Sequence, residues 1–227
     1  SHLIMCHQHP NKKRSALDSM LKQTRQDFEN DMEMVCRPTP TTFDYVLSAF
    51  YNTALYAQEN DNDAVLIALK EAEEVLNLME QQEADLGGTI DHGTAYESEK
   101  LKPYHTMLKL YRVISPNLLA DYPKKIDDLM VRMIGKDVYE NLLRSDGGTV
   151  PPEFSHHILQ DLVHSFASAR DRECLDKAKV LLEKMAKTRS AALQNDPNFL
   201  TWNPKFPFSS SYNSVIMGCV LYGDDIL

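Results

Sequence analysis

Basic and aromatic residues gather in one short stretch of this sequence. Residues 100–136 hold eight lysines and arginines but only three acidic residues. The basic residues are Lys100, Lys102, Lys109, Arg112, Lys124, Lys125, Arg132 and Lys136, and Tyr104, His105 and Tyr111 lie among them. Proteins bind single-stranded nucleic acid with cations that follow the phosphates and aromatic rings that stack on the bases. The stretch is therefore a candidate phosphate-binding patch.

A strongly acidic stretch precedes the basic one and offers a second interpretation. Residues 38–99 hold 13 acidic residues and one basic residue. The basic residues could instead form a solvated surface or neutralise this acidic neighbour. The chain carries a formal net charge of −9, which argues against uniform coating of a nucleic acid, because each phosphate contact relies on a cation.

Two small groups combine residue types that bind metals. They are His156, His157 and His164, and Cys6, His7 and His9. A zinc site needs about four convergent ligands at ordered spacing. His157 and His164 could share a helix face, but no cysteine or acidic residue stands at a matching spacing. We therefore expect packed or surface histidines, with no metal ion and no cofactor.

Catalytic motifs do not stand out from this sequence. The patterns GxxxxGK[ST], GxSxG and HExxH do not occur. Carboxylates are frequent in residues 59–85, but their helical spacing predicts a solvated outer surface. We expect no enzyme and no small-molecule substrate.

Cysteine spacing and the length of apolar runs also bound the class of protein. Cys6, Cys36, Cys174 and Cys219 stand far apart without a CxxC pair. They predict buried thiols in a reducing compartment. No apolar run approaches the roughly 18 residues that a transmembrane helix requires, so we expect no membrane span.

Helical periodicity dominates the sequence and must position these residues. Residues 64–80 and 172–188 each place apolar residues at steps of three and four, which predicts one buried stripe per helix. The first stripe contains Val65, Ala68, Leu69, Ala72, Val75, Leu76 and Met79, and the second contains Leu175, Ala178, Leu181, Leu182 and Met185. Two further segments fit the same frame, 126–133 with Leu129, Met130 and Met133, and 13–20 with Ala16, Leu17 and Met20.

A second kind of helix is predicted over 41–57, 102–114, 153–166 and 210–223. Its apolar frames are Phe43, Val46, Leu47 and Phe50; Tyr104, Met107, Leu108 and Tyr111; Ile158, Leu159, Leu162 and Phe166; and Tyr212, Val215 and Ile216. Because Tyr104 and Tyr111 fall on this frame, we expect them in the core.

The two kinds of helix alternate along the chain, which is typical of stacked helix hairpins. We expect an all-α fold, an α-solenoid of antiparallel helix hairpins forming a single array over 1–227. The array would comprise a half-unit at 12–35, units at 38–84, 100–136 and 152–193, and at 209–223 the first helix of a further unit or a terminal cap. Residues 85–101, 144–152 and 194–208 would separate the units. Trp202, Phe206 and Phe208 in the last separator predict either a cover over the helices or an exposed partner-binding patch.

Short motifs recur where these units begin and end. The segments TFDYVL (42–47), SHHILQ (155–160) and SYNSVI (211–216) open first helices, and AEEVLNLM (72–79) and AKVLLEKM (178–185) close units. Pro38, Pro103 and Pro152 stand just before first helices. This pattern resembles the pentatricopeptide-repeat family, whose units open with T-Y-N-T-L-I and close with A-x-x-L-hydrophobic-x-x-M and a proline-bearing turn.

The resemblance implies an organellar protein, in a mitochondrion or plastid, that binds single-stranded RNA and acts in RNA processing, stability or translation. A minority of the family are structural subunits of organellar ribosomes or other complexes. A protein–protein scaffold is therefore the alternative, and the acidic balance of the chain favours it.

In the family, a polar residue near the start of the first helix reads one base together with the residue that ends the preceding linker. The matching positions here are Asp44, His105, His157 and Asn213, after the linker residues Thr39, Lys100, Pro152 and Phe208. Favoured pairs combine Thr, Ser or Asn with Asn or Asp, and only Asn213 supplies a favoured first member. We therefore do not expect ordered base-by-base reading. The candidate RNA-binding residues are Asp44, Lys100, Lys102, His105, Lys109, Arg112, His157 and Asn213.

Overall fold

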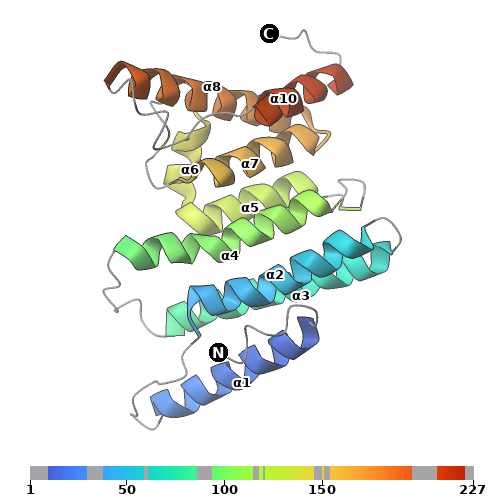
Figure 1. The fold of residues 1–227 in the computed structure, drawn as a ribbon, viewed down its shortest axis with the longest axis vertical. Coiled ribbons are helices and arrows are strands. Elements are labelled where there is room, and N and C mark those ends of the chain that lie inside the picture. Colours follow the sequence, from blue (N-terminus) through green and yellow to red (C-terminus); the bar gives the residue numbers. More distant parts are fainter. Residues whose placement is uncertain are drawn as a thin grey trace. The chain divides into compact units, whose positions relative to one another are not determined.

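The fold of the described part of the chain is built from helices. The computed structural model describes residues 10–29, 38–58, 61–85, 94–114, 118–119, 121–145, 150, 154–195 and 209–222, and within these ranges every regular element is an α-helix (Figure 1). The all-α prediction is therefore confirmed for these residues. The chain divides into two compact units, Ser1–Ile114 and Ser115–Leu227, and the boundary falls inside the predicted unit 100–136. The array of stacked hairpins stays a prediction.

The first unit contains α1 (Pro10–Glu29), α2 (Pro40–Ala57), α3 (Asn62–Asp85) and α4 (Thr94–Val113). Helix α2 contacts the other three, with α3 behind it and α4 beside it (Figure 1). The side-chain amide of Gln82 donates to the carbonyl oxygen of Pro38 over 2.9 Å, which ties the end of α3 to the start of α2. Helices α2 and α3 therefore form an antiparallel hairpin.

Two tyrosines fix the direction of α4. The hydroxyl groups of Tyr104 and Tyr111 donate to Glu80 and Glu73 of α3 over 2.8 and 2.7 Å. Because the later tyrosine meets the earlier glutamate, α4 runs antiparallel to α3 and hence parallel to α2. Both rings are buried, as their place on the apolar frame predicts. The prediction that the carboxylates of 59–85 form a solvated surface is wrong for these two glutamates, because they accept hydrogen bonds from core tyrosines.

The core of the α2–α3 hairpin follows the predicted stripes. All predicted apolar residues of 41–57 and 64–80 are buried. Helix α2 begins as its sequence indicates: Thr39 and Thr42 form a reciprocal capping box, and Pro40 occupies the first turn, where its missing N–H removes no helical bond.

The start of α4 differs from the prediction. Residues 85–101 were expected to separate two units, but α4 begins at Thr94, and Pro103 lies inside the helix rather than before it. The segment 94–102 is rich in good helix formers, Ala, Glu, Leu and Lys, and these extend the helix N-terminally past the proline. Lys100, expected to end a linker, is consequently a helical residue.

The second unit contains α5 (Tyr122–Ile134), α6 (Lys136–Leu143), α7 (His156–Ser168), α8 (Arg172–Asn195) and α10 (Ser209–Tyr222). Helices α7 and α8 pack together, and α10 packs on both of them. Helix α6 was not predicted. Its eight residues carry only a short apolar pattern, but Tyr139 and Leu142 are buried, and α6 packs against α5 and α8. Gly135 separates it from α5 with a φ of 82°, a backbone region that glycine adopts readily.

The apolar frames of the second unit are confirmed with one exception. Every predicted core residue of 126–133, 153–166 and 172–188 is buried. In α10, however, Val215 is buried, whereas Tyr212 and Ile216 are 41% and 40% exposed. The face of α10 that rests on α7 and α8 carries Val215 and Cys219, so Tyr212 and Ile216 point away from these helices.

The two cysteines within the described residues are buried, as the sequence predicts. Cys174 and Cys219 are free and buried, while Cys6 and Cys36 lie outside the described residues, as do Trp202, Phe206 and Phe208. Among the described helices, none combines the length and hydropathy needed to span a bilayer.

Candidate nucleic-acid-binding surface

Four of the predicted residues form one row along α4. Lys102, His105, Lys109 and Arg112 follow one another at steps of three, four and three residues. Because an α-helix turns by about 100° per residue, the four side chains fall within an arc of about 80°. Lys102 and Arg112 are exposed, and the other two are partly buried. We call this row the α4 stripe.

The α4 stripe faces away from α3. Tyr104 and Tyr111, which bond to α3, leave the helix on the side opposite Lys102 and Lys109. Lys102 lies 3.9 Å from Glu99, and both side chains are about half exposed. Such an exposed pair contributes at most about 1 kcal/mol, so a phosphate can replace the carboxylate.

Lys100 does not belong to the stripe. Its Nζ lies 2.8 Å from Oε2 of Glu83 on α3, whose side chain is only 20% exposed. Lys100 and Lys102 stand two positions apart, a rotation of about 200°, which places them on nearly opposite sides of α4. The structure therefore assigns Lys100 to the α3–α4 contact.

Asp44 lies at the contact between α2 and α4. The hydroxyl group of Thr106 donates to Oδ1 of Asp44 over 2.6 Å, and Asp44 is partly buried. A predicted base-reading residue thus holds two helices together. It also places a carboxylate next to the α4 stripe.

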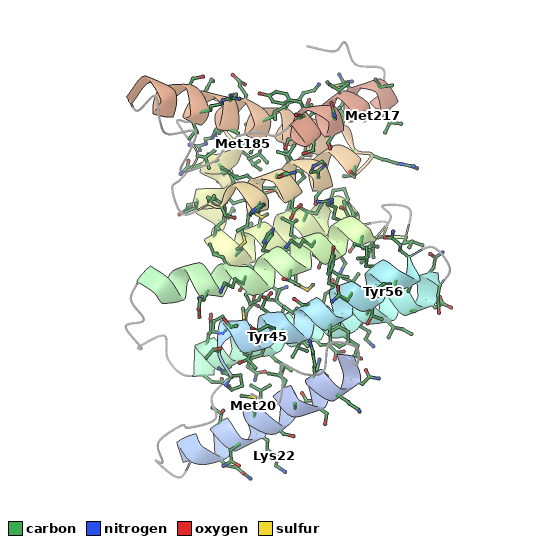
Figure 2. All side chains as sticks on the ribbon, in the orientation of Figure 1. Met20, Lys22, Tyr45, Tyr56, Met185 and Met217 are labelled. Carbon is green, nitrogen blue, oxygen red and sulfur yellow. The ribbon has the colours of Figure 1, made fainter. Side chains whose placement is uncertain are left out.

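Helix α2 carries a second row that the sequence interpretation missed. Tyr45, Ser48, Asn52 and Tyr56 follow at steps of three, four and four, again within an arc of about 80°. Tyr45 is 45% exposed and Tyr56 is 84% exposed, and Figure 2 labels both on α2. We call this row the α2 stripe. Its signal in the sequence is two tyrosines that fall off the apolar frame of their own helix.

The two stripes lie on the same face of the first unit. Residues of α2 opposite the α2 stripe, such as Leu47 and Ala54, are buried. Helix α3 packs against both α2 and α4, and it lies behind α2 in Figure 1. Because each stripe is opposite the residues that meet α3, each points to the side away from α3. The bond between Asp44 and Thr106 marks the line between them. A row of cations thus runs parallel to a row with exposed tyrosines.

The other predicted residues belong to the second unit. His157 on α7 and Asn213 on α10 are exposed. Other residues form the hydrogen bonds between these two helices. Gln160 Nε2 donates to Ser210 Oγ over 2.9 Å, and His164 Nδ1 meets the hydroxyl group of Ser214. The remaining basic residues, Lys124, Lys125, Arg132 and Lys136, also lie outside the first unit, so the α4 stripe does not include them.

A charged cluster joins α5, α6 and α8. Lys177 Nζ lies 2.8 Å from Asp127 Oδ2 and 2.9 Å from Glu173 Oε1, and the hydroxyl group of Tyr139 donates to the other oxygen of Asp127. Burial, together with the bond to Asp127, raises the pKa of Tyr139 far above its usual value. Burial lowers the pKa of Lys177, but its bonds to Asp127 and Glu173 outweigh this effect and leave the pKa raised.

The neighbouring thiol is inert. Burial, with the nearby Asp171 carboxylate, raises the pKa of Cys174 to about 12. Since the thiolate is the nucleophilic form, this thiol is unreactive at neutral pH. The cluster around Lys177 therefore links α5, α6 and α8 and lies beside a thiol that is not an activated nucleophile.

Within the described residues, no group of side chains suggests a metal site. Among the residues that the structure describes, no three His, Cys, Asp or Glu side chains are placed to hold a metal ion together. Comparison of the chain with protein-family models, curated proteins and solved structures found no match. The function is therefore inferred from the chain's own geometry, and above all from the two stripes of the first unit.

Proposed function

We propose that this chain is a non-enzymatic helical-repeat module that binds single-stranded RNA. The observation that supports the proposal is the α4 stripe, in which three permanent cations share one exposed helix face with His105. Cations in such a row can contact successive phosphates, each of which needs a positive partner. The parallel α2 stripe adds the exposed aromatic ring of Tyr45, the second component of single-strand binding surfaces.

Single strands fit this face better than a duplex. An exposed tyrosine ring such as that of Tyr45 can stack on a base only where the base is unpaired. The resemblance to pentatricopeptide-repeat proteins favours RNA over DNA, and it supports an α-solenoid of hairpins and a role in organellar RNA processing, stability or translation.

A protein–protein scaffold is the second candidate, and one helix favours it. The 14 residues of α10 include no charged residue, and five of its large apolar side chains are exposed. These side chains are Tyr212, Ile216, Met217, Val220 and Leu221, all between 40% and 63% exposed. Exposed apolar patches are typical of protein-interaction sites. A subunit of an organellar ribosome or another complex would use such a face.

The test is fluorescence anisotropy with a labelled, unstructured RNA, titrated with protein from low to physiological salt. We expect micromolar or tighter binding that weakens steeply with salt, and weaker binding to a duplex of the same length. Lack of binding even at low salt would overturn the proposal and leave the scaffold as the remaining candidate.

A further inference from the structure

We propose that Tyr45 is a base-stacking platform and that this face of the first unit holds unstructured RNA with little preference for base identity. The inference rests on the proposed function and specifies how the strand is held. The α4 stripe would bind the phosphates, and the ring of Tyr45 would stack on a base.

Tyr45 is set apart from its neighbours by exposure. Val46 and Leu47 are fully buried, whereas Tyr45, in the second turn of the same helix, is 45% exposed. Its backbone is well anchored, because the Nζ of the buried Lys13 donates to its carbonyl oxygen over 3.2 Å. The ring is therefore an accessible apolar surface on a supported helix, which suits stacking.

The register of the two helices places Tyr45 beside the cations. Asp44 contacts Thr106, and α2 runs parallel to α4, so Tyr45 lies level with Met107. That level falls between Lys102 and Lys109 of the α4 stripe. Packed helices lie about 8–10 Å apart, which a nucleotide can span from its base to its phosphate.

The same contact argues against base reading at this position. Asp44 already accepts a hydrogen bond from Thr106, and its charge repels phosphates that approach over α2. A tyrosine ring, in contrast, accepts any base, since every base has a π-face. This face should therefore select RNA that is unpaired and flexible, with little regard to its base sequence.

Tyr56 provides a matched control on the same helix. It belongs to the same stripe and is even more exposed, at 84%. By the register above, however, it lies beyond the level of Val113, where α4 ends. A ring there has no cation of the α4 stripe opposite it.

The experiment compares Tyr45→Ala, Tyr45→Phe and Tyr56→Ala by anisotropy with unstructured RNAs of different composition, each over a salt series. We expect Tyr45→Ala to weaken binding at least about fivefold for every composition without changing the salt slope, because stacking rather than a phosphate contact is lost. Tyr45→Phe should bind as the unmodified chain does, and Tyr56→Ala should stay within about twofold of it. Circular dichroism checks that each variant is folded.

Three other outcomes would overturn the inference. If the unmodified chain binds RNA with a steep salt dependence but Tyr45→Ala binds equally well, the stacking platform is wrong and the proposed function stands. If Tyr45→Ala lowers the salt slope, the ring acts through the phosphate contacts instead. If the unmodified chain binds no RNA at low salt, the proposed function and the platform both fail.

Discussion

The hydroxyl group of Thr106 on α4 donates to a carboxylate oxygen of Asp44 on α2 over 2.6 Å. This bond sets the register of two parallel helices whose outer faces carry the α2 and α4 stripes. It also gives Asp44 a structural role, in contrast to the base-reading role that the family resemblance implies for its position.

Replacing Asp44 by asparagine separates these two roles. The amide oxygen of Asp44→Asn can still accept from Thr106, while the negative charge beside the α4 stripe disappears. We expect RNA affinity at low salt to rise about two- to fivefold, because a repulsion of phosphates is removed. Anisotropy with several RNA sequences measures this. A selective loss of affinity for some sequences would instead show that Asp44 reads a base.

The tyrosine bonds between α4 and α3 should stabilise the first unit. Tyr104→Phe and Tyr111→Phe remove the donors to Glu80 and Glu73 and leave partly buried carboxylates with one partner fewer. Hydrogen bonds to charged groups contribute about 1.5–3 kcal/mol, so each variant should lose about this much unfolding free energy in urea. Tyr56→Phe, at an exposed position, is the control. Losses no larger than that of the control would show that these bonds contribute nothing.

The stability of the second unit should fall in alkaline solution. The pKa of Cys174 rises from an ordinary 9.0 to about 12 on folding, so the unfolded chain loses this proton first as the pH passes 9. Deprotonation then favours the unfolded state, and stability that is complete below pH 9 is lost progressively towards pH 12. The raised pKa values of Tyr139 and Lys177 act in the same direction. Urea midpoints at pH 8 and pH 10.5 should drop less for Cys174→Ala than for the unmodified chain. Equal drops would contradict this account.

The exposed face of α10 should tolerate charge. Met217 and Val220 are 58% and 57% exposed, so Met217→Glu with Val220→Glu should change the unfolding free energy by no more than about 0.5 kcal/mol. Val215→Glu, on the buried side of the same helix, should destabilise strongly, because it buries an unpaired charge. If the double variant were as unstable as Val215→Glu, this face would be packed. If the scaffold candidate is correct, the double variant should also lose a co-purifying protein partner.

The sequence predicts the core well because apolar periodicity reports directly on burial. The stripes from Val65 to Met79 and from Leu175 to Met185 are buried residue for residue. The predicted burial of Tyr212 and Ile216 is wrong, because periodicity shows that a helix face is apolar but not whether another helix covers it. The early start of α4 at Thr94 was missed because good helix formers ahead of Pro103 extend the helix past the proline. The short α6 was missed because its apolar pattern is short and only Tyr139 and Leu142 are buried.

The candidate site was only partly predictable for a similar reason. Spacing alone aligns Lys102, Lys109 and Arg112, since all three lie on one helix. The pairing of Lys100 with Glu83, and that of Asp44 with Thr106, depend on which helices pack together, and no local pattern encodes this. Tyr45 can be proposed as a binding residue only because the structure places α4 beside α2.

The central claim is that the α4 stripe contacts RNA phosphates, and the salt slope of binding tests it most directly. The variant carries Lys102→Gln, Lys109→Gln and Arg112→Gln, and a control with the same charge change carries Lys70→Gln, Lys136→Gln and Lys187→Gln at exposed positions elsewhere. Each phosphate contact on a single strand contributes about 0.7 to the slope of log affinity against log salt. The stripe variant should therefore lose about 2 from the slope and bind weakly, while the control keeps the slope of the unmodified chain. Equal slopes in the two variants would contradict the claim.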